Sequence, residues 1–85
     1  MKIFENIINH KINTITAEEL VKYSKQFNIA VTLEQARKIA KYLNGKNINI
    51  FSDRERAQLI REIAKAAGPD IAREVNTLFK ELTKS

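Results

Sequence analysis

The segment Asn44–Ile63 reads NGKNINIFSDRERAQLIREI and contains the end of one helix, a short apolar connection and the start of another helix. Gly45 follows a run of apolar residues at helical spacing, where a glycine in the left-handed conformation ends a helix. The cluster Ile48–Phe51 favours extended backbone and is too short for a helix. Ser52 and Glu55 have the spacing of a capping box, in which each side chain accepts a hydrogen bond from the other residue's backbone N–H. The segment therefore predicts a tight corner between two helices.

Similar boundary signals occur along the rest of the chain. Thr16 with Glu19, and Thr32 with Gln35, predict two further capping boxes. The Gly68-Pro69 pair separates the last two helices, because proline suits the first position of a helix. The predicted helices cover residues 2–12, 17–27, 33–44 and 53–67, and the segment from 69 onward. We expect an all-α bundle of about five short helices in a single domain, 1–85, since 85 residues suit one small core.

Four of these helices carry an apolar stripe that predicts the buried face. In the first helix the stripe is Ile3, Phe4, Ile7, Ile8 and Ile12, and its β-branched residues mean that packing must hold the helix. In the second it is Leu20, Val21, Ser24 and Phe27. In the fourth it is Ala57, Ile60, Ile63, Ala64 and Ala67. In the last it is Ile71, Val75, Leu78, Phe79 and Leu82.

The apolar connections 29–31 and 48–50 each lie between two predicted helices. One interpretation is that each simply leads into a helix cap, and the generality of such caps favours it. The other is that the two pair as a minimal two-stranded bridge, an arrangement that resembles paired EF-hands. Calcium is not expected in either case, because Lys46 and Ile48 occupy positions of the window 44–55 where carboxylate ligands would stand.

The whole positive excess of the chain lies between residues 36 and 65. This segment holds eight basic and three acidic residues, which equals the net charge of +5, and the remaining residues balance to zero. The candidate face for an anion or a nucleic acid consists of Arg37, Lys38, Lys41, Lys46, Arg54, Arg61 and Lys65. Such a face suits phosphate contacts. The alternative, which composition favours, is an ordinary solvated surface that includes Glu55 and Glu62.

The residue inventory predicts no enzyme, no cofactor and no metal site. The chain has no Cys, and His10 is its only histidine, with only Glu5 within one helical turn as a partner for a metal. Neither Ser24 nor Ser52 has a histidine nearby in sequence, and two glycines cannot form a phosphate-binding loop. A nucleophile, a general base and a set of ligands are therefore all missing.

The chain is similar to the YqfT-like family of short uncharacterised proteins from Gram-positive spore-formers. The resemblance rests on the segments IFENIINHKINTIT, NIAVTLEQA, NGKNINIFSDRER and AREVNTLFKEL, and it spans nearly the full length. It implies a small cytosolic helical protein and supplies no functional residues. A cytoplasmic location also agrees with the absence of Cys, of a signal peptide and of a membrane-spanning apolar run. We expect a non-catalytic module that binds another protein or a second copy of itself, with weak non-specific nucleic-acid binding as the alternative.

Overall fold

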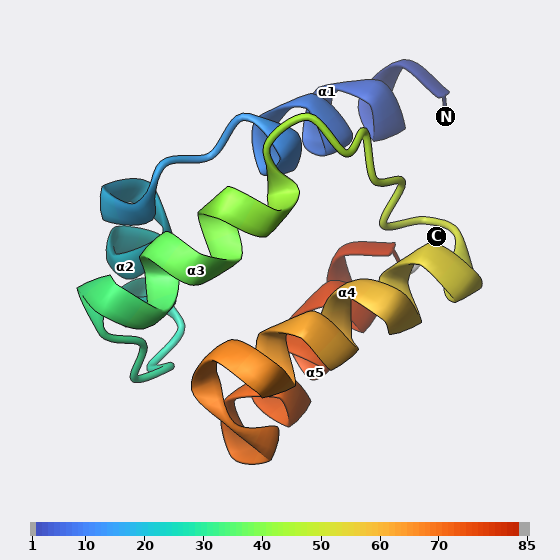
Figure 1. Cartoon of the computed structure of the whole chain (residues 1–85). Coiled ribbons are helices and arrows are strands. Elements are labelled where there is room, and N and C mark those ends of the chain that lie inside the picture. The colour runs from blue at the N-terminus through green and yellow to red at the C-terminus, as the bar shows by residue number, and fades with distance from the viewer. Residues whose placement is uncertain (1, 84–85) are drawn as a thin grey trace.

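The computed structural model describes residues 2–83, and this part of the chain folds into five helices (Figure 1). The helices are α1 (Lys2–Asn13), α2 (Ala17–Gln26), α3 (Leu33–Leu43), α4 (Asp53–Ala67) and α5 (Pro69–Thr83). The predicted all-α architecture is confirmed, and the predicted boundaries lie close to the observed ones. Over the described residues, no helix is both long enough and apolar enough to cross a bilayer.

Local capping chemistry sets the starts of α2 and α3. The Thr16 hydroxyl accepts from the Glu19 backbone N–H at 3.1 Å, and the Glu19 carboxylate accepts from the Thr16 N–H at 3.0 Å. Thr32 and Gln35 form the same reciprocal pair at 3.1 and 3.0 Å. Both capping boxes are therefore confirmed. Gly68, with φ of +95°, ends α4 in a conformation that L side chains rarely adopt, and α5 begins at the next residue.

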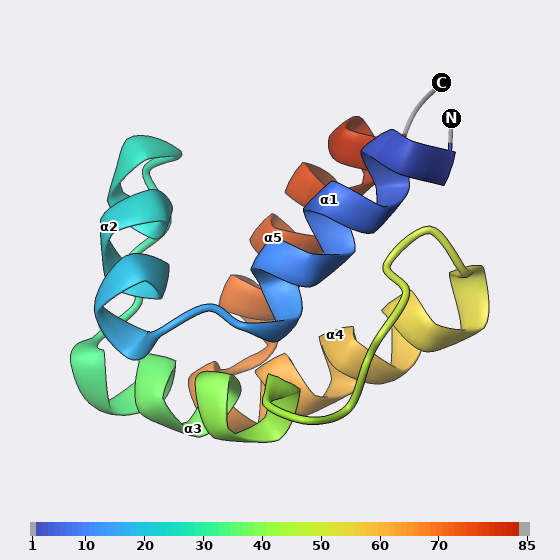
Figure 2. The same cartoon turned by 90° about the horizontal axis from the view of Figure 1, so that it is seen from above.

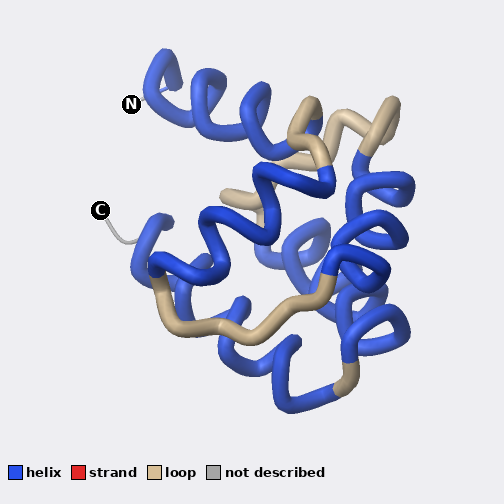
Figure 3. The backbone as a smooth tube through the Cα atoms, turned by 90° about the vertical axis from the view of Figure 1, so that its left-hand side faces the viewer, coloured by secondary structure: helices blue, strands red, loops and turns tan. Residues whose placement is uncertain are grey.

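The helices pack mainly against their neighbours in sequence. α2 packs on α3, α3 on α4 and α4 on α5, whereas α1 contacts only α3 closely. Seen from above, α1 lies over α5 and runs in the opposite direction (Figure 2). Figure 1 shows these two helices on separate levels, and their backbones make no close contact. The N-terminal end of α1 and the C-terminal end of α5 lie at the same end of the molecule (Figures 2 and 3).

The core lies where α3, α4 and the connection between them meet. Its largest fully buried side chains are Ile50, from the connection, and Leu59, from α4. The remaining buried members of the cluster are Ile15, Ile39, Leu43, Ile48, Ile63 and Ala72. The predicted stripe of α4 omitted Leu59 and included Ala57, which is exposed. The helix is turned so that the larger side chain is buried, because buried apolar area stabilises in proportion to its size.

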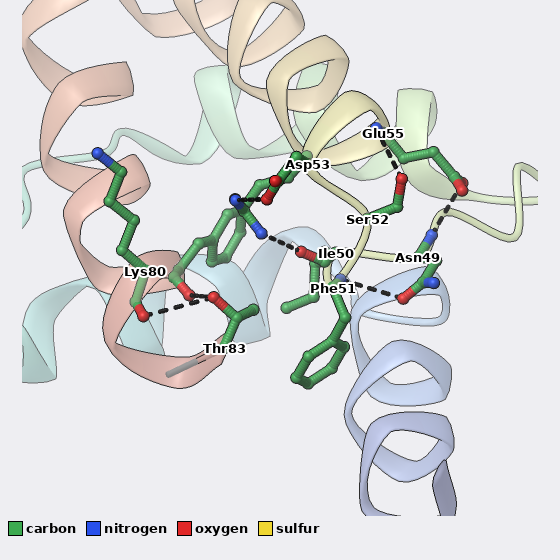
Figure 4. Close-up of polar contacts among 10 residues, drawn as sticks. Asn49, Ile50, Phe51, Ser52, Asp53, Glu55, Lys80 and Thr83 are labelled. Atoms are coloured by element: carbon green, nitrogen blue, oxygen red, sulfur yellow. Dashed lines mark hydrogen bonds and ion pairs between the residues drawn. The ribbon is translucent and has the colours of Figure 1, made fainter. Parts of the chain in front are cut away.

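The corner between α3 and α4 differs in one detail from the predicted capping box. The Ser52 hydroxyl accepts from the Glu55 N–H, but the Glu55 carboxylate accepts from the Asn49 N–H at 3.1 Å (Figure 4). The Ser52 N–H donates instead to the Asn49 carbonyl at 3.1 Å, so it is not available to Glu55. Gly45 and Asn47, with φ of +81° and +53°, supply the left-handed residues that turn the chain after α3.

The two-stranded bridge between 29–31 and 48–50 is absent, because residues 2–83 contain no strand (Figure 3). The backbone of the second connection bonds to side chains of α1 instead. Asn13 binds the N–H and the carbonyl of Ile48, and Asn9 accepts from the N–H of Ile50. An Asn amide offers the same donor and acceptor as a peptide group, so these side chains take the place of a paired strand.

Candidate functional site

An apolar cavity of about 220 Å³ opens into the core between α2 and α5. Leu43, Leu59 and Ile63 are among the buried core residues that line it. Leu20 of α2 and Leu78 of α5 also line it. Tyr23 and Ser24 carry the only polar side-chain atoms of its lining, all other lining side chains being Ile, Leu, Val or Phe. The cavity is therefore suited to an apolar group rather than to a polar or charged ligand.

The cavity stays open because its two walls do not meet. α2 packs on α3 and α5 packs on α4, and the backbones of α2 and α5 make no close contact. Phe27 after α2 and Leu82 at the end of α5 both line the cavity and are 52% and 40% exposed. The prediction that the whole stripe of α5 is buried is wrong, since only Ala72 of this helix is fully buried. Of the predicted stripe, Ile71, Val75 and Phe79 are partly buried against the core cluster, and Leu82 is exposed.

A second uncovered apolar surface lies on α1. The residues Ile3, Phe4 and Ile7, here called the α1 edge, are 73%, 58% and 63% exposed. The second half of the predicted stripe does pack, because Ile8 and Ile12 contact the core cluster. The sequence prediction of one buried stripe is therefore wrong for the first half of the helix. Within the described residues, nothing lies against the α1 edge to bury it.

The amide side chains of Asn9 and Asn13, here called the amide clamp, tie α1 to the connection between α3 and α4. Asn13 makes two 2.8 Å hydrogen bonds to the backbone of Ile48, and the Ile50 N–H donates to Asn9 Oδ1 at 3.0 Å. Asn9 Nδ2 also donates to Asn49 Oδ1 at 2.8 Å. Asn9 and Asn13 are one helical turn apart, so they lie on the same side of α1. The clamp fixes the rotation of the helix and leaves the α1 edge facing outward.

An ion pair fastens the end of α1 to α2. The Lys11 ammonium binds the Glu19 carboxylate, which also accepts the backbone bond of the Thr16 cap. The hydrogen bond to Glu19 raises the pKa of Lys11 above its ordinary value. The hydrogen bonds from Lys11 and from the Thr16 N–H lower the pKa of Glu19. The two groups therefore stabilise each other's charged form.

The residues of the predicted basic face are all exposed. Arg37, Lys38 and Lys41 lie on the side of α3 away from its buried residues, as the helical spacing requires. Lys46 and Arg54 line one shallow hollow together with Tyr42, and the Lys46 ammonium lies 5.2 Å from the centre of the tyrosine ring. The structure places none of the other five predicted residues in this hollow, namely Arg37, Lys38, Lys41, Arg61 and Lys65.

Ion pairs leave most of the basic face available for anions. Among residues 2–83, Lys65 is the only member of the predicted set with an acidic partner, Glu62 at 3.0 Å. Arg56 is the remaining basic residue of the segment 36–65, and it is half-buried at the corner. Its guanidinium donates to the Ile50 carbonyl at 2.9 Å and pairs with Asp53 (Figure 4). Arg56 is therefore part of the corner rather than of the exposed face.

The described part of the chain holds no group of three His, Cys, Asp or Glu side chains that could bind a metal. His10 is exposed and lines a polar hollow whose other members are Asn, Thr, Gly and Ile residues. Ser52 is engaged as a helix cap, and Ser24 lies in the apolar cavity lining without a histidine among its neighbours there. The absence of catalysis, cofactor and metal stays a prediction from the residue inventory.

The fold and these surfaces describe a small all-α protein with an apolar cavity, an uncovered apolar helix edge and a basic face. The family model described as "Protein of unknown function (DUF2624)" matches residues 1–83. The "Uncharacterized protein YqfT" of Bacillus subtilis (strain 168) is 42% identical over 83 residues, which cover 98% of this chain and 99% of that relative. The chain therefore belongs to this family, as the sequence resemblance indicated. No solved structure matches the chain.

Proposed function

We propose that this protein is a non-catalytic protein-binding module that uses the α1 edge and the mouth of the apolar cavity. The observation that carries the proposal is the exposure of Ile3, Phe4 and Ile7, together with Phe27 and Leu82 at the cavity. Exposed apolar patches on small soluble proteins mark interaction sites, and aromatic side chains are enriched in the buried centres of interfaces.

The two surfaces belong to one apolar system. Ile12 of α1 lines the cavity, Ile8 packs beside it on the core, and the α1 edge continues the same stripe toward the N-terminal end. A partner that fills the cavity can therefore also cover the edge. Protein interiors are close-packed, so an apolar side chain that enters this space gains contacts that the free protein lacks. An amphipathic helix laid into an apolar groove is a common form of such binding.

The proposal is tested by affinity capture from native lysate with variants of the apolar surface. Wild type should retain partner proteins after nuclease treatment, and Ile7→Glu and Leu82→Glu should each lose them, because a charge is placed where apolar contact is needed. Asn6→Glu is the matched control, since Asn6 is exposed on the same helix and lines the polar hollow with Asn9 and Asn13. The proposal would be contradicted if Ile7→Glu and Leu82→Glu retained the partners at wild-type level. It would also be contradicted if nuclease removed every partner.

A second candidate function is weak, non-specific nucleic-acid binding through the basic face. It is supported by the exposure of all seven predicted basic residues and by the lack of an acidic partner for six of them within residues 2–83. Exposed cations of this kind bind phosphates chiefly by releasing counterions. The capture experiment separates the two candidates, because nuclease abolishes only the second kind of complex.

A further inference from the structure

We infer that the cavity mouth is occupied by the α1 edge of a second copy of this chain, in a two-fold symmetric dimer. This inference rests on the proposed function, since it uses the same surface, and it names the partner. Each copy would place its Phe4 and Ile7 against Phe27 and Leu82 of the other copy. In this isologous arrangement the same contact occurs twice, as a two-fold axis requires.

The chain itself carries both halves of the contact. The α1 edge is a projecting apolar row on a helix, and the cavity between α2 and α5 is an apolar recess with an exposed rim. The N-terminal end of α1 and the C-terminal end of α5 lie at the same end of the molecule (Figures 2 and 3). The edge and the Leu82 side of the rim therefore belong to one region, which a two-fold rotation can bring against its own copy.

The buried area also favours a reciprocal contact. A stable interface buries about 800 Å² on each partner, which the three side chains of one α1 edge cannot provide alone. When both edges dock, each copy buries two surfaces in the interface, its own α1 edge and its own cavity rim. The docking of one edge without the other would leave half of this apolar surface in water.

The charge distribution allows two basic molecules to approach through this region. The excess of +5 lies between residues 36 and 65, on α3, the corner and α4. The remaining residues, which include α1, α2 and α5, hold seven basic and seven acidic side chains. The α1 edge itself has no charged member. Contact through this neutral region avoids bringing the two basic faces together, and like charges in contact would oppose association.

Dimer formation also accounts for a stable first half of α1. Short helices are marginal in water, and the β-branched Ile3 and Ile7 lower the helix propensity of a segment that no other described element covers. Burial of these side chains in a dimer would stabilise the helix. The melting temperature should then rise with protein concentration, because dimerisation adds to the stability of the folded state.

Sedimentation equilibrium of the full chain tests the inference. Wild type should pass from monomer to dimer as the concentration rises, and Ile7→Glu should weaken dimerisation by about tenfold or more. Ile7 is exposed in the single chain, so the variant should keep the helical bundle, and circular dichroism should show at most a loss of helical signal from the first half of α1. Asn6→Glu adds the same charge to the same helix and should dimerise like wild type. A wild-type monomer at every concentration, or equal weakening by Ile7→Glu and Asn6→Glu, would overturn the inference.

A charge-swap mixture tests which surfaces meet. Ile7→Glu and Leu82→Lys should each associate weakly alone, and an equal mixture should recover a heterodimer, because one contact then pairs Glu with Lys and the other keeps both native side chains. No recovery in the mixture would overturn the reciprocal geometry. If wild type is monomeric but lysate capture still yields an Ile7-dependent protein, the dimer is wrong and the proposed binding function stands. If neither association depends on Ile7 or Leu82, both are wrong.

Discussion

Asn13 binds both backbone groups of Ile48, a residue 35 positions away in the chain. Its Nδ2 donates to the Ile48 carbonyl and its Oδ1 accepts from the Ile48 N–H, each at 2.8 Å. This pairing supplies the hydrogen bonds that a neighbouring strand would otherwise provide. It lets a short extended segment enter the core without a sheet, and it ties α1 to the body of the molecule.

Replacement of Asn13 by Ala should lower the free energy of unfolding by about 1–3 kcal/mol, because it leaves two part-buried backbone groups of Ile48 without partners. Asn13→Asp should also destabilise, because it keeps the acceptor for the Ile48 N–H but places a carboxylate oxygen against the carbonyls of Ile48 and Asn9, to which Asn13 Nδ2 donates. Urea melts would measure both. Asn6 is exposed and lines the same polar hollow as Asn9 and Asn13, so Asn6→Ala is the control and should leave the midpoint nearly unchanged. Equal midpoints for Asn13→Ala and Asn6→Ala would show that the clamp adds nothing to stability.

The helix caps should differ in strength. Thr16→Ala and Ser52→Ala should each lower stability by about 1 kcal/mol, as the loss of an N-cap typically does. The Thr16 effect should be the larger, because Thr16 forms a complete capping box, whereas Ser52 accepts a single bond at 3.4 Å. Denaturant midpoints of the two variants, with Thr16→Ser as a cap-preserving control, would measure the difference. A larger loss for Ser52→Ala would contradict the observed geometry.

The Lys11–Glu19 ion pair should add a small pH-dependent contribution to stability. The pKa of Glu19 is lowered from 4.5, so its contribution is present above pH 4.5 and is lost as the pH falls through the lower, folded-state value. The pKa of Lys11 is raised from 10.5, so its contribution is present below pH 10.5 and is lost as the pH rises through the folded-state value. Melts of wild type and Glu19→Gln should therefore differ at neutral pH and converge in strong acid. Added salt should shrink the difference, because the pair is exposed. An equal difference in stability between wild type and Glu19→Gln at every pH would contradict this prediction.

The basic face should bind nucleic acid weakly and with a steep dependence on salt, if the second candidate function holds. Affinity for a generic duplex or single strand should fall as salt rises, since each phosphate contact releases counterions. Arg54→Glu with Arg61→Glu should abolish this binding and leave stability nearly unchanged, because both side chains are exposed. Fluorescence anisotropy at several salt concentrations would measure it. Binding that changes neither with salt nor with charge reversal would indicate another surface. No binding at low salt would rule out this candidate function.

The sequence alone was sufficient to predict the structural features that depend on residues close together in the chain. Thr16 with Glu19, Thr32 with Gln35, and the Gly68-Pro69 pair predicted helix boundaries that the structure confirms. Capping bonds join residues three positions apart, so their spacing can be read directly from the chain. The exposure of the basic face was predictable for the same reason, since helical periodicity separates charged from apolar sides.

Contacts between distant segments were decided only by the tertiary structure. Periodicity showed that Phe4, Ile7 and Leu82 lie on apolar faces, but it could not show whether another helix covers them. Glu55 reached Asn49 instead of Ser52 because the turn had already used the Ser52 N–H. The bonds of Asn13 to Ile48 join distant segments, and no spacing rule anticipates them. The apolar content of each face is a property of the local sequence, whereas its burial depends on how closely the other helices approach, and here α1, α2 and α5 leave an open cavity and an uncovered edge.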